Sequence, residues 1–176
     1  MADYYSSASF VVAMTAEQAA VAATILHLVQ DEDHPDLLAR RPSRALRQEY
    51  APEVLSRARR IRRLLINNGD MELDYLALEF DFEPMTSEGA TGLWVSDCGE
   101  HINGNKAATC IQELLRHFGL DHPVGFEVAY HCSKARLDAF GGCAFFITRK
   151  SIRWNSTMCW LEQQFQRLKA RTSTTD

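Results

Sequence analysis

The spacing of hydrophobic residues along the chain predicts four helices. Thr15 and Gln18 form a capping box, and apolar residues at helical spacing continue from there to Val29. A second helix starts at Pro52, a residue favoured in the first turn, and a third is ended by Gly119. The predicted helices cover residues 15–29, 52–66, a segment up to 118, and 157–168.

Alternation of hydrophobic and polar residues predicts the strands. From Tyr75 to Glu83, Leu78, Phe80 and Phe82 alternate with acidic residues, as in a strand with one wet face. Turn residues from 84 to 92 separate this strand from a returning one, which predicts a hairpin. The predicted strands cover residues 9–14, 75–83, 93–96, 124–131 and 143–148, with the last resuming through 152–154.

The order of these elements, β-α-α-β-β-α-β-β-α, predicts an α+β protein. Helices would cover one face of a mainly antiparallel sheet, giving a two-layer sandwich. Two similar triplets, Ala22-Ala23-Thr24 and Ala107-Ala108-Thr109, start 85 residues apart, close to half the chain length. They point to an internal duplication of two strand–helix units in a ferredoxin-like arrangement.

Length and composition are typical of one globular domain. The chain has 176 residues, of which 46% are hydrophobic and 24% are charged, so we expect a single domain over 1–170 and a flexible tail at 171–176. No apolar run approaches the roughly 20 residues of a membrane helix, and the N-terminus lacks the features of a secretory signal. We therefore expect a cytoplasmic protein that does not bind a membrane.

Charge is partitioned between two adjacent segments. Residues Leu38 to Asn68 contain nine arginines and two acids, whereas Gly69 to His101 contain nine acids and neither lysine nor arginine. These opposite charges nearly cancel in the net charge of −4. Because such fields govern which molecules a surface attracts, the partition is the main functional signal of the sequence.

The arginines of the second helix are candidate nucleic-acid contacts. Arg59, Arg60 and Arg63 fall opposite its apolar stripe, where they would face phosphates. The alternative is a solvated helix face whose charge is neutralised by the acidic segment. Upstream arginines would add to a phosphate-binding surface: Arg40, Arg41, Arg44 and Arg47.

The acidic strand is the complementary candidate. Glu79, Asp81 and Glu83 would project from one face about 6.8 Å apart, with Glu88 close by in sequence. Their repulsion would be relieved by the arginine helix or by a basic partner, for which this face would imitate phosphates. A metal is the least favoured ligand, since carboxylates on a regular strand diverge and no calcium-loop pattern is present.

Cysteine and histidine residues offer a third kind of chemistry. Cys98, His101, His131 and Cys132 could form a zinc site or a Cys–His pair. Their spacing matches no known framework, and adjacent strand residues such as His131 and Cys132 point to opposite faces. No metal ligand, cofactor or catalytic residue is therefore assigned, and the five cysteines are expected to be reduced thiols.

The loop from Ser133 to Gly142 is a candidate anion site. Its basic side chains and exposed backbone N–H groups could hold an anion. Alternatively, Phe140 anchors the loop on the core while the glycines permit a bulge. The candidate anion ligands are Ser133, Lys134, Arg136, Gly141 and Gly142.

The stretch from His131 to Leu161 resembles uncharacterised proteins of bacterial mobile elements. The resemblance rests on Cys-Ser-Lys-x-Arg, on Phe-Gly-Gly-x-Ala and on the segment from Trp154 to Trp160, and covers under a third of the chain. It implies a bacterial or phage context, in which small inhibitors and immunity proteins occur. It implies no activity and no catalytic residue.

These observations favour a non-catalytic protein that binds another macromolecule. The preferred hypothesis is an inhibitor, of the anti-defence or immunity kind, that captures a protein partner with the acidic face. The alternatives are a nucleic-acid-binding regulator that uses the arginine helix, and an anion-binding or Cys/His-dependent enzyme. The sequence leaves the oligomeric state open.

Overall fold

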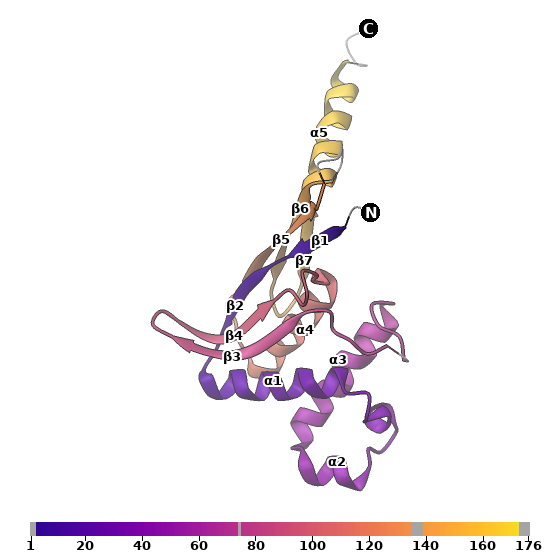
Figure 1. The fold of residues 1–176 in the computed structure, drawn as a ribbon, viewed down its shortest axis with the longest axis vertical. Coiled ribbons are helices and arrows are strands. Elements are labelled where there is room, and N and C mark those ends of the chain that lie inside the picture. The colour runs from indigo at the N-terminus through magenta and orange to yellow at the C-terminus, as the bar shows by residue number, and fades with distance from the viewer. Residues whose placement is uncertain (1–2, 74, 135–138, 173–176) are drawn as a thin grey trace.

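The computed structural model describes residues 3–73, 75–134 and 139–172, with side chains described up to residue 167 (Figure 1). The described strands are β1 (Tyr4–Ser7), β2 (Ser9–Ala13), β3 (Asp81–Ser87), β4 (Ala90–Ser96), β5 (Val124–Cys132), β6 (Gly141–Ile147) and β7 (Ile152–Ser156). The helices are α1 (Ala16–Gln30), α2 (Arg44–Glu49), α3 (Pro52–Asn67), α4 (Gly104–Phe118) and α5 (Thr157–Thr172), with a short 3-10 helix η1 (Pro35–Leu38).

The strands form two antiparallel sheets that are joined through β1 and β2. The first sheet has the order β1-β5-β6-β7, and the second has the order β2-β4-β3. Only Ala8 separates β1 from β2, so one stretch of chain pairs with β5 on one side and with β4 on the other. The strands therefore follow one another in space from β3 to β7.

This order contains the ferredoxin-like arrangement. From β5 through the β1–β2 stretch and β4 to β3, neighbouring strands are antiparallel. The helical connection from β2 to β3 passes over β4, and the connection from β4 to β5 passes over the β1–β2 stretch. The predicted α+β fold with a mainly antiparallel sheet is confirmed, and β6, β7 and α5 extend it beyond β5.

Two helices, α1 and α4, pack on the strands. α1 packs against β3 and β4, and α4 packs against β6 and β7. Phe126 stacks on both Phe10 and Phe145, with ring centroids 4.3 and 4.8 Å away, so the two sheets share one core. At the start of α4, a Cβ on Gly104 would lie 2.7 Å from the Phe145 ring. Glycine here lets the helix approach the sheet closely.

The arginine-rich segment forms a unit outside these two layers. α3 packs mainly against α1 and α4, and η1 and α2 pack against α3 (Figure 1). The stripe predicted from the sequence (Val54, Ala58, Ile61 and Leu65) is buried. Because this stripe faces other helices, the rest of α3 is free to present its arginines.

Several short sequence patterns adopt the local structures that they predict. Thr15 caps α1 in a reciprocal capping box with Gln18, and Pro52 is the first residue of α3. Gly119 ends α4 in the left-handed conformation, with φ of 66°. The segment predicted to resume after β6 is a separate strand, β7, which follows a turn closed by a hydrogen bond from Thr148 N to Ser151 O.

The bounds predicted for the acidic strand, Tyr75 to Glu83, are wrong. Glu79 has φ of 60°, which a regular strand does not permit, and its carbonyl accepts a hydrogen bond from Asn103 N at 3.1 Å. The strand β3 therefore begins at Asp81 and continues through Pro84, which an edge strand tolerates because its N–H is not needed. The hairpin turn falls at Gly89, whose φ is 125°.

The two alanine-rich triplets occupy equivalent helices. Ala22 and Ala23 lie in α1, Ala107 and Ala108 lie in α4, and all four are buried. The triplets start at the seventh residue of α1 and the fourth residue of α4, one turn apart. Their likeness follows from two helices that pack closely on a common core, while a duplication of the sequence stays a prediction.

No helix in the described ranges is both long and apolar enough to cross a membrane. α5 continues to Thr172, and the rest of the predicted tail, residues 173–176, lies outside the described residues.

Candidate functional site: an arginine-lined groove

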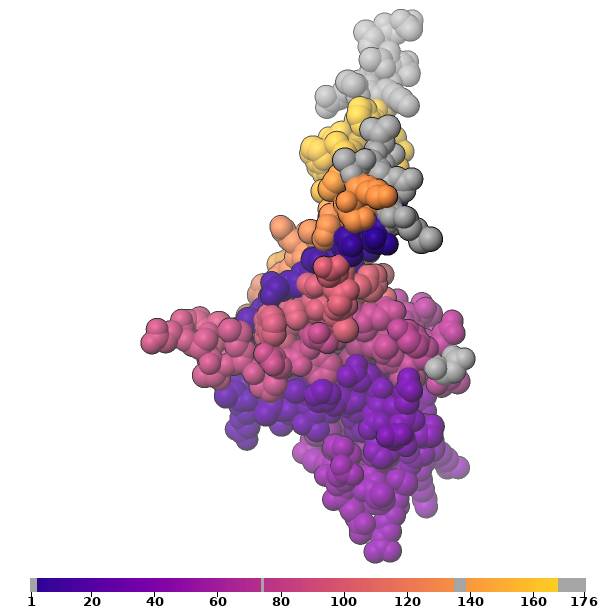
Figure 2. Space-filling model, in the orientation of Figure 1, coloured from indigo at the N-terminus to yellow at the C-terminus, as the bar shows by residue number. Residues whose placement is uncertain are grey.

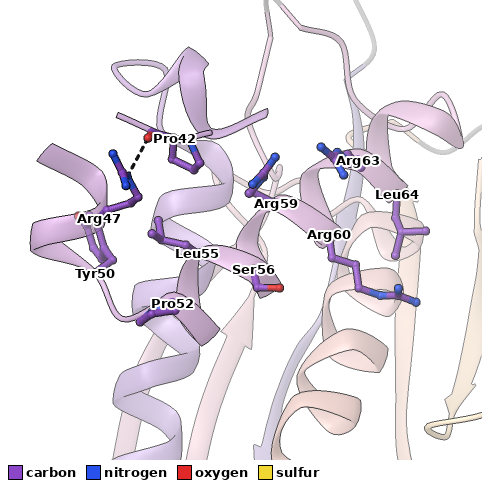
Figure 3. Close-up of a pocket in the computed structure, with 10 residues that line it drawn as sticks. All are labelled: Pro42, Arg47, Tyr50, Pro52, Leu55, Ser56, Arg59, Arg60, Arg63 and Leu64. Carbon is purple, nitrogen blue, oxygen red and sulfur yellow. Dashed lines mark hydrogen bonds between the residues drawn. The ribbon is translucent and has the colours of Figure 1, made fainter. Parts of the chain in front are cut away.

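A groove of about 780 Å³ lies between α2 and α3 (Figure 3). Leu55, Leu64, Pro42 and Pro52 provide its apolar surface, and Tyr50 and Ser56 add two hydroxyls. The four basic side chains that line it are Arg47, Arg59, Arg60 and Arg63. The structure thus brings the three arginines predicted from the helix period together with one from the upstream segment.

The three arginines of α3 differ in what they contact. Arg59 donates to the carbonyl of Ala39, while its Nε is buried without a hydrogen-bond partner among the described residues. Arg60 donates from Nε to Glu113 at 2.6 Å, and in Figure 3 its side chain turns away from the other two. Arg63 is exposed and has no side-chain bond or ion pair within the described ranges. Arg59 and Arg63 are therefore the groove arginines of α3 with charge available to a ligand.

The upstream arginines enlarge the basic surface. Arg47 donates from Nε to the carbonyls of Pro42 and Ser43, which fixes its side chain at the groove without neutralising it. Arg40, Arg41 and Arg44 are exposed on the same unit and form no ion pair with any described residue. No acidic side chain of the described chain lines the groove.

Glu113 of α4 holds the base of this unit in place. Its carboxylate is fully buried and accepts hydrogen bonds from Arg57, from Arg60 at 2.6 Å and from Arg116 at 2.5 Å. Burial alone would raise the pKa of Glu113, but the bonds from Arg116, Arg60 and Arg57 outweigh it and lower the pKa below its ordinary value. This carboxylate therefore stays ionised and anchors α3 on α4.

Arg62 has a structural role that the sequence did not reveal. Its side chain is buried, and its guanidinium donates to the carbonyls of Leu28, Val29, Asp31 and His34 at 2.7–2.9 Å. These carbonyls end α1 and begin the following loop, where helical partners are missing. Arg62 thus ties α3 to the end of α1 and contributes nothing to the groove.

Three of the four acidic candidates, Glu79, Asp81 and Glu83, line one groove, but Glu79 is neutralised within the fold. Glu79 is bound by Asn103 at 2.9 Å and by buried Lys106 of α4 at 3.1 Å. Burial would raise the pKa of Glu79, but these bonds lower it overall. Asp81 and Glu83 are exposed on β3, whereas Glu88 lies in the turn at the far end of the hairpin. The predicted acidic row therefore reduces to Asp81 and Glu83.

The basic and acidic segments do not pair with one another among the described residues. The basic segment finds its carboxylate in Glu113, and Glu79 of the acidic segment finds its cation in Lys106. Both partners belong to α4. The favoured interpretation of the acidic residues was that they pair directly with the basic segment. This interpretation is wrong, because no ion pair among the described residues joins the two segments.

Cys98 and His101 lie side by side, joined by two backbone hydrogen bonds, but the side chains of the four cysteine and histidine candidates have different surroundings. His101 Nδ1 lies 2.9 Å from the Ser6 hydroxyl, His131 stacks on Tyr5, and Cys132 is buried. The carboxylate of Asp81 raises the pKa of the exposed Cys98 thiol, which disfavours a reactive thiolate. Within the described ranges, no three His, Cys, Asp or Glu side chains gather as metal ligands.

The two glycines of the candidate anion loop take part in strand pairing and close strand packing. Gly141 and Gly142 begin β6, and the N–H of Gly142 donates to Thr157 Oγ1 at 3.2 Å. A Cβ on Gly142 would lie 2.9 Å from the carbonyl of Val128, so close strand packing explains this glycine. Ser133 bonds with Asp3 through its hydroxyl and its N–H. Arg136 lies outside the described residues, and Lys134 is exposed.

Comparison of the chain with protein-family models, curated protein sequences and solved structures finds no match. The function is therefore argued from the surfaces of this molecule.

Proposed function

We propose that this protein is a non-catalytic nucleic-acid-binding protein whose arginine groove holds the phosphate backbone. The observation that carries the proposal is the groove of Arg47, Arg59 and Arg63, three cations without a carboxylate partner among the described residues. Arginine suits phosphates because its planar fork of donors matches two phosphate oxygens. This function was the alternative interpretation of the sequence.

The shape of the groove fits a chain rather than a small ion. It lies along the outer side of α3, where arginines at 59 and 63 follow one another by one helical turn (Figure 3). The exposed Arg40, Arg41 and Arg44 extend the positive surface beyond it. A backbone with regularly spaced phosphates would contact several of these arginines at once.

The chemistry of the groove supports binding without sequence recognition. Its polar side chains are arginines, one tyrosine and one serine, which contact phosphates but supply no general base at neutral pH. Phosphate contacts position a nucleic acid without reading its bases. The net charge of −4 would confine the nucleic acid to this one face.

The test is a fluorescence-anisotropy titration of labelled single-stranded DNA, RNA and duplex DNA between about 50 and 200 mM salt. The variant combines Arg47→Gln, Arg59→Gln and Arg63→Gln, and leaves Arg60 because it pairs with Glu113. The matched control, Lys134→Gln with Lys150→Gln and Arg153→Gln, removes the same charge from exposed residues elsewhere. We expect binding to be weakened only in the groove variant; absence of binding by the unaltered protein at low salt would contradict the proposal.

The acidic side of β3 supports a second candidate, capture of a basic protein segment. Asp81 and Glu83 line a groove of about 700 Å³ together with the aromatic rings of Tyr75, Phe82 and Trp94. Carboxylates beside aromatic faces suit lysine and arginine side chains. An inhibitor encoded by a phage or plasmid would use such a surface against a nucleic-acid-binding protein.

A labelled lysine- and arginine-rich peptide tests this second candidate. Asp81→Asn with Glu83→Gln should weaken its binding most at low salt, because exposed charges are screened as salt rises. Glu88→Gln, in the distant turn, is the control. Equal peptide binding by all three proteins would exclude the acidic groove.

A further inference from the structure

Large hydrophobic side chains are exposed mainly at one end of the molecule. Of the eleven in the described chain, nine belong to the first sheet, to α5 or to the residue before β6. This end forms the narrow upper part of the molecule in Figure 2, where the orange and yellow surface stands clear of the body. Single exposed apolar residues are ordinary, but a cluster of this size marks an interaction surface.

Most of these side chains lie on one side of that end. Tyr4, Tyr130 and Trp154 line one depression, and a second contains Tyr4 and Tyr130 with Met158 and Leu161. Phe165 follows Leu161 by one helical turn, on the same stripe of α5. We call this surface the C-terminal apolar face: Tyr4, Tyr130, Phe140, Trp154, Met158, Leu161 and Phe165.

α5 lacks the packing that supports the other long helices. In α4, eight of 15 residues are buried, whereas no side chain between residues 157 and 167 of α5 is buried. Its main contacts are with β6 and β7. A helix of this length is marginal in water by itself, because packing of an apolar stripe supplies most helical stability.

We propose that the C-terminal apolar face binds a second copy of this chain in a two-fold symmetric dimer. Its seven side chains are 42–65% exposed, which amounts to about 800 Å² for residues of this size. One partner of a stable, standard-size complex contributes about that area. The face therefore has the extent that a dimer needs without any further surface.

A symmetric dimer would also complete the packing of α5. A two-fold axis that places the helices antiparallel covers the stripe of Met158, Leu161 and Phe165 of each copy with the same stripe of the other. Each α5 thereby gains the packing that it lacks.

Light scattering coupled to size-exclusion chromatography tests the dimer. We expect the 176-residue chain to have twice the 19.9 kDa mass of one copy, and to dissociate on dilution. Leu161→Glu and Phe165→Glu should each raise the dissociation constant about 30-fold or more, since they place a charge in the centre of the interface. Leu73→Glu makes the same change at an exposed leucine outside this face, and should leave the mass unchanged.

Three results would overturn the proposal. The first is a single-chain mass at all concentrations up to about 100 µM, since a dimer weaker than this lacks a well-packed interface. The second is a dimer that persists in Leu161→Glu and Phe165→Glu. The third is dissociation by Leu73→Glu, which would place the interface elsewhere. Far-ultraviolet circular dichroism of each variant separates loss of the dimer from loss of the fold.

Discussion

The two charged segments of this chain are of similar length, but the fold uses them in opposite ways. The arginines of residues 38–68 lie on one helical unit, and those at 47, 59 and 63 share a groove. The acidic candidates of residues 69–101 are divided between an irregular segment, an edge strand and a turn. Of these, Glu79 forms an ion pair with Lys106. One segment therefore presents several unneutralised arginines at its groove, and the other presents only Asp81 and Glu83 at a second groove.

The difference arises from the backbone that carries each segment. A helix repeats its face every three to four residues, so α3 keeps its arginines together once its apolar stripe is buried. The acidic stretch would need an unbroken strand to do the same, and Glu79, with φ of 60°, interrupts it. α4 adds to the contrast, since Glu113 and Lys106 each neutralise part of one segment. Charge composition alone does not tell whether charges act together.

The largest effect is expected from Arg62→Ala, which separates structural from functional arginines. The substitution leaves four carbonyls, two buried and two partly buried, at the end of α1 and in the following loop without their donor, and we expect it to lower the free energy of unfolding by about 4 kcal/mol. Arg63→Ala, at the neighbouring exposed position, should change it by less than about 0.5 kcal/mol. Urea denaturation at one protein concentration measures both, and equal effects would contradict the assignment.

The next effect is expected from Glu113→Gln. Removal of this buried charge leaves Arg57, Arg60 and Arg116 facing one another, and we expect a loss of about 3 kcal/mol, because the arginines are partly solvated. Glu53→Gln, an exposed acid of α3, is the matched control. A Glu113→Gln protein as stable as the control would show that α3 is not anchored through this carboxylate.

The same carboxylate predicts a pH dependence. The pKa of Glu113 is lower in the folded protein than the ordinary value of 4.5. The ionised carboxylate therefore makes its full contribution to the free energy of unfolding above pH 4.5. That contribution is lost as the pH falls through the lower, folded-state pKa. Unfolding followed by urea at several pH values below about 5 should show a smaller decline in Glu113→Gln than in the unaltered protein. Parallel declines would contradict the assignment.

The smallest effect on stability is expected from the acidic strand. Asp81→Asn with Glu83→Gln removes two exposed charges without an ion-pair partner among the described residues, so the free energy of unfolding should change by less than about 0.5 kcal/mol. A loss above about 1 kcal/mol in the same urea measurement would show that these acids are structural, contrary to the comparison drawn above.

The sequence predicted those features that depend on neighbouring residues. The capping box at Thr15, the start of α3 at Pro52 and the end of α4 at Gly119 are each encoded within a few positions, and the structure has all three. The α+β class followed from the order of these elements. The exposed arginines of α3 followed from the helix period, because burial of one stripe leaves the opposite face outside.

Features that depend on distant contacts were not predictable in this way. Arg62 is buried because carbonyls 28 to 34 residues earlier meet it, and Lys106 is buried beside Glu79, 27 positions away. Glu79 leaves the strand conformation because Asn103 binds it. None of these contacts has a local pattern, so the division of the charged segments into structural and available residues required the fold.

The salt dependence of nucleic-acid binding measures how many arginines of the groove contact phosphates. We predict that the logarithm of the binding constant falls linearly with the logarithm of salt concentration, and that Arg47→Gln, Arg59→Gln and Arg63→Gln together reduce the slope by about 3, since each phosphate contact contributes about 0.9. The charge-matched control with Lys134→Gln, Lys150→Gln and Arg153→Gln should keep the original slope. Equal slopes for the two variants, or no binding at low salt, would contradict the assignment of the groove.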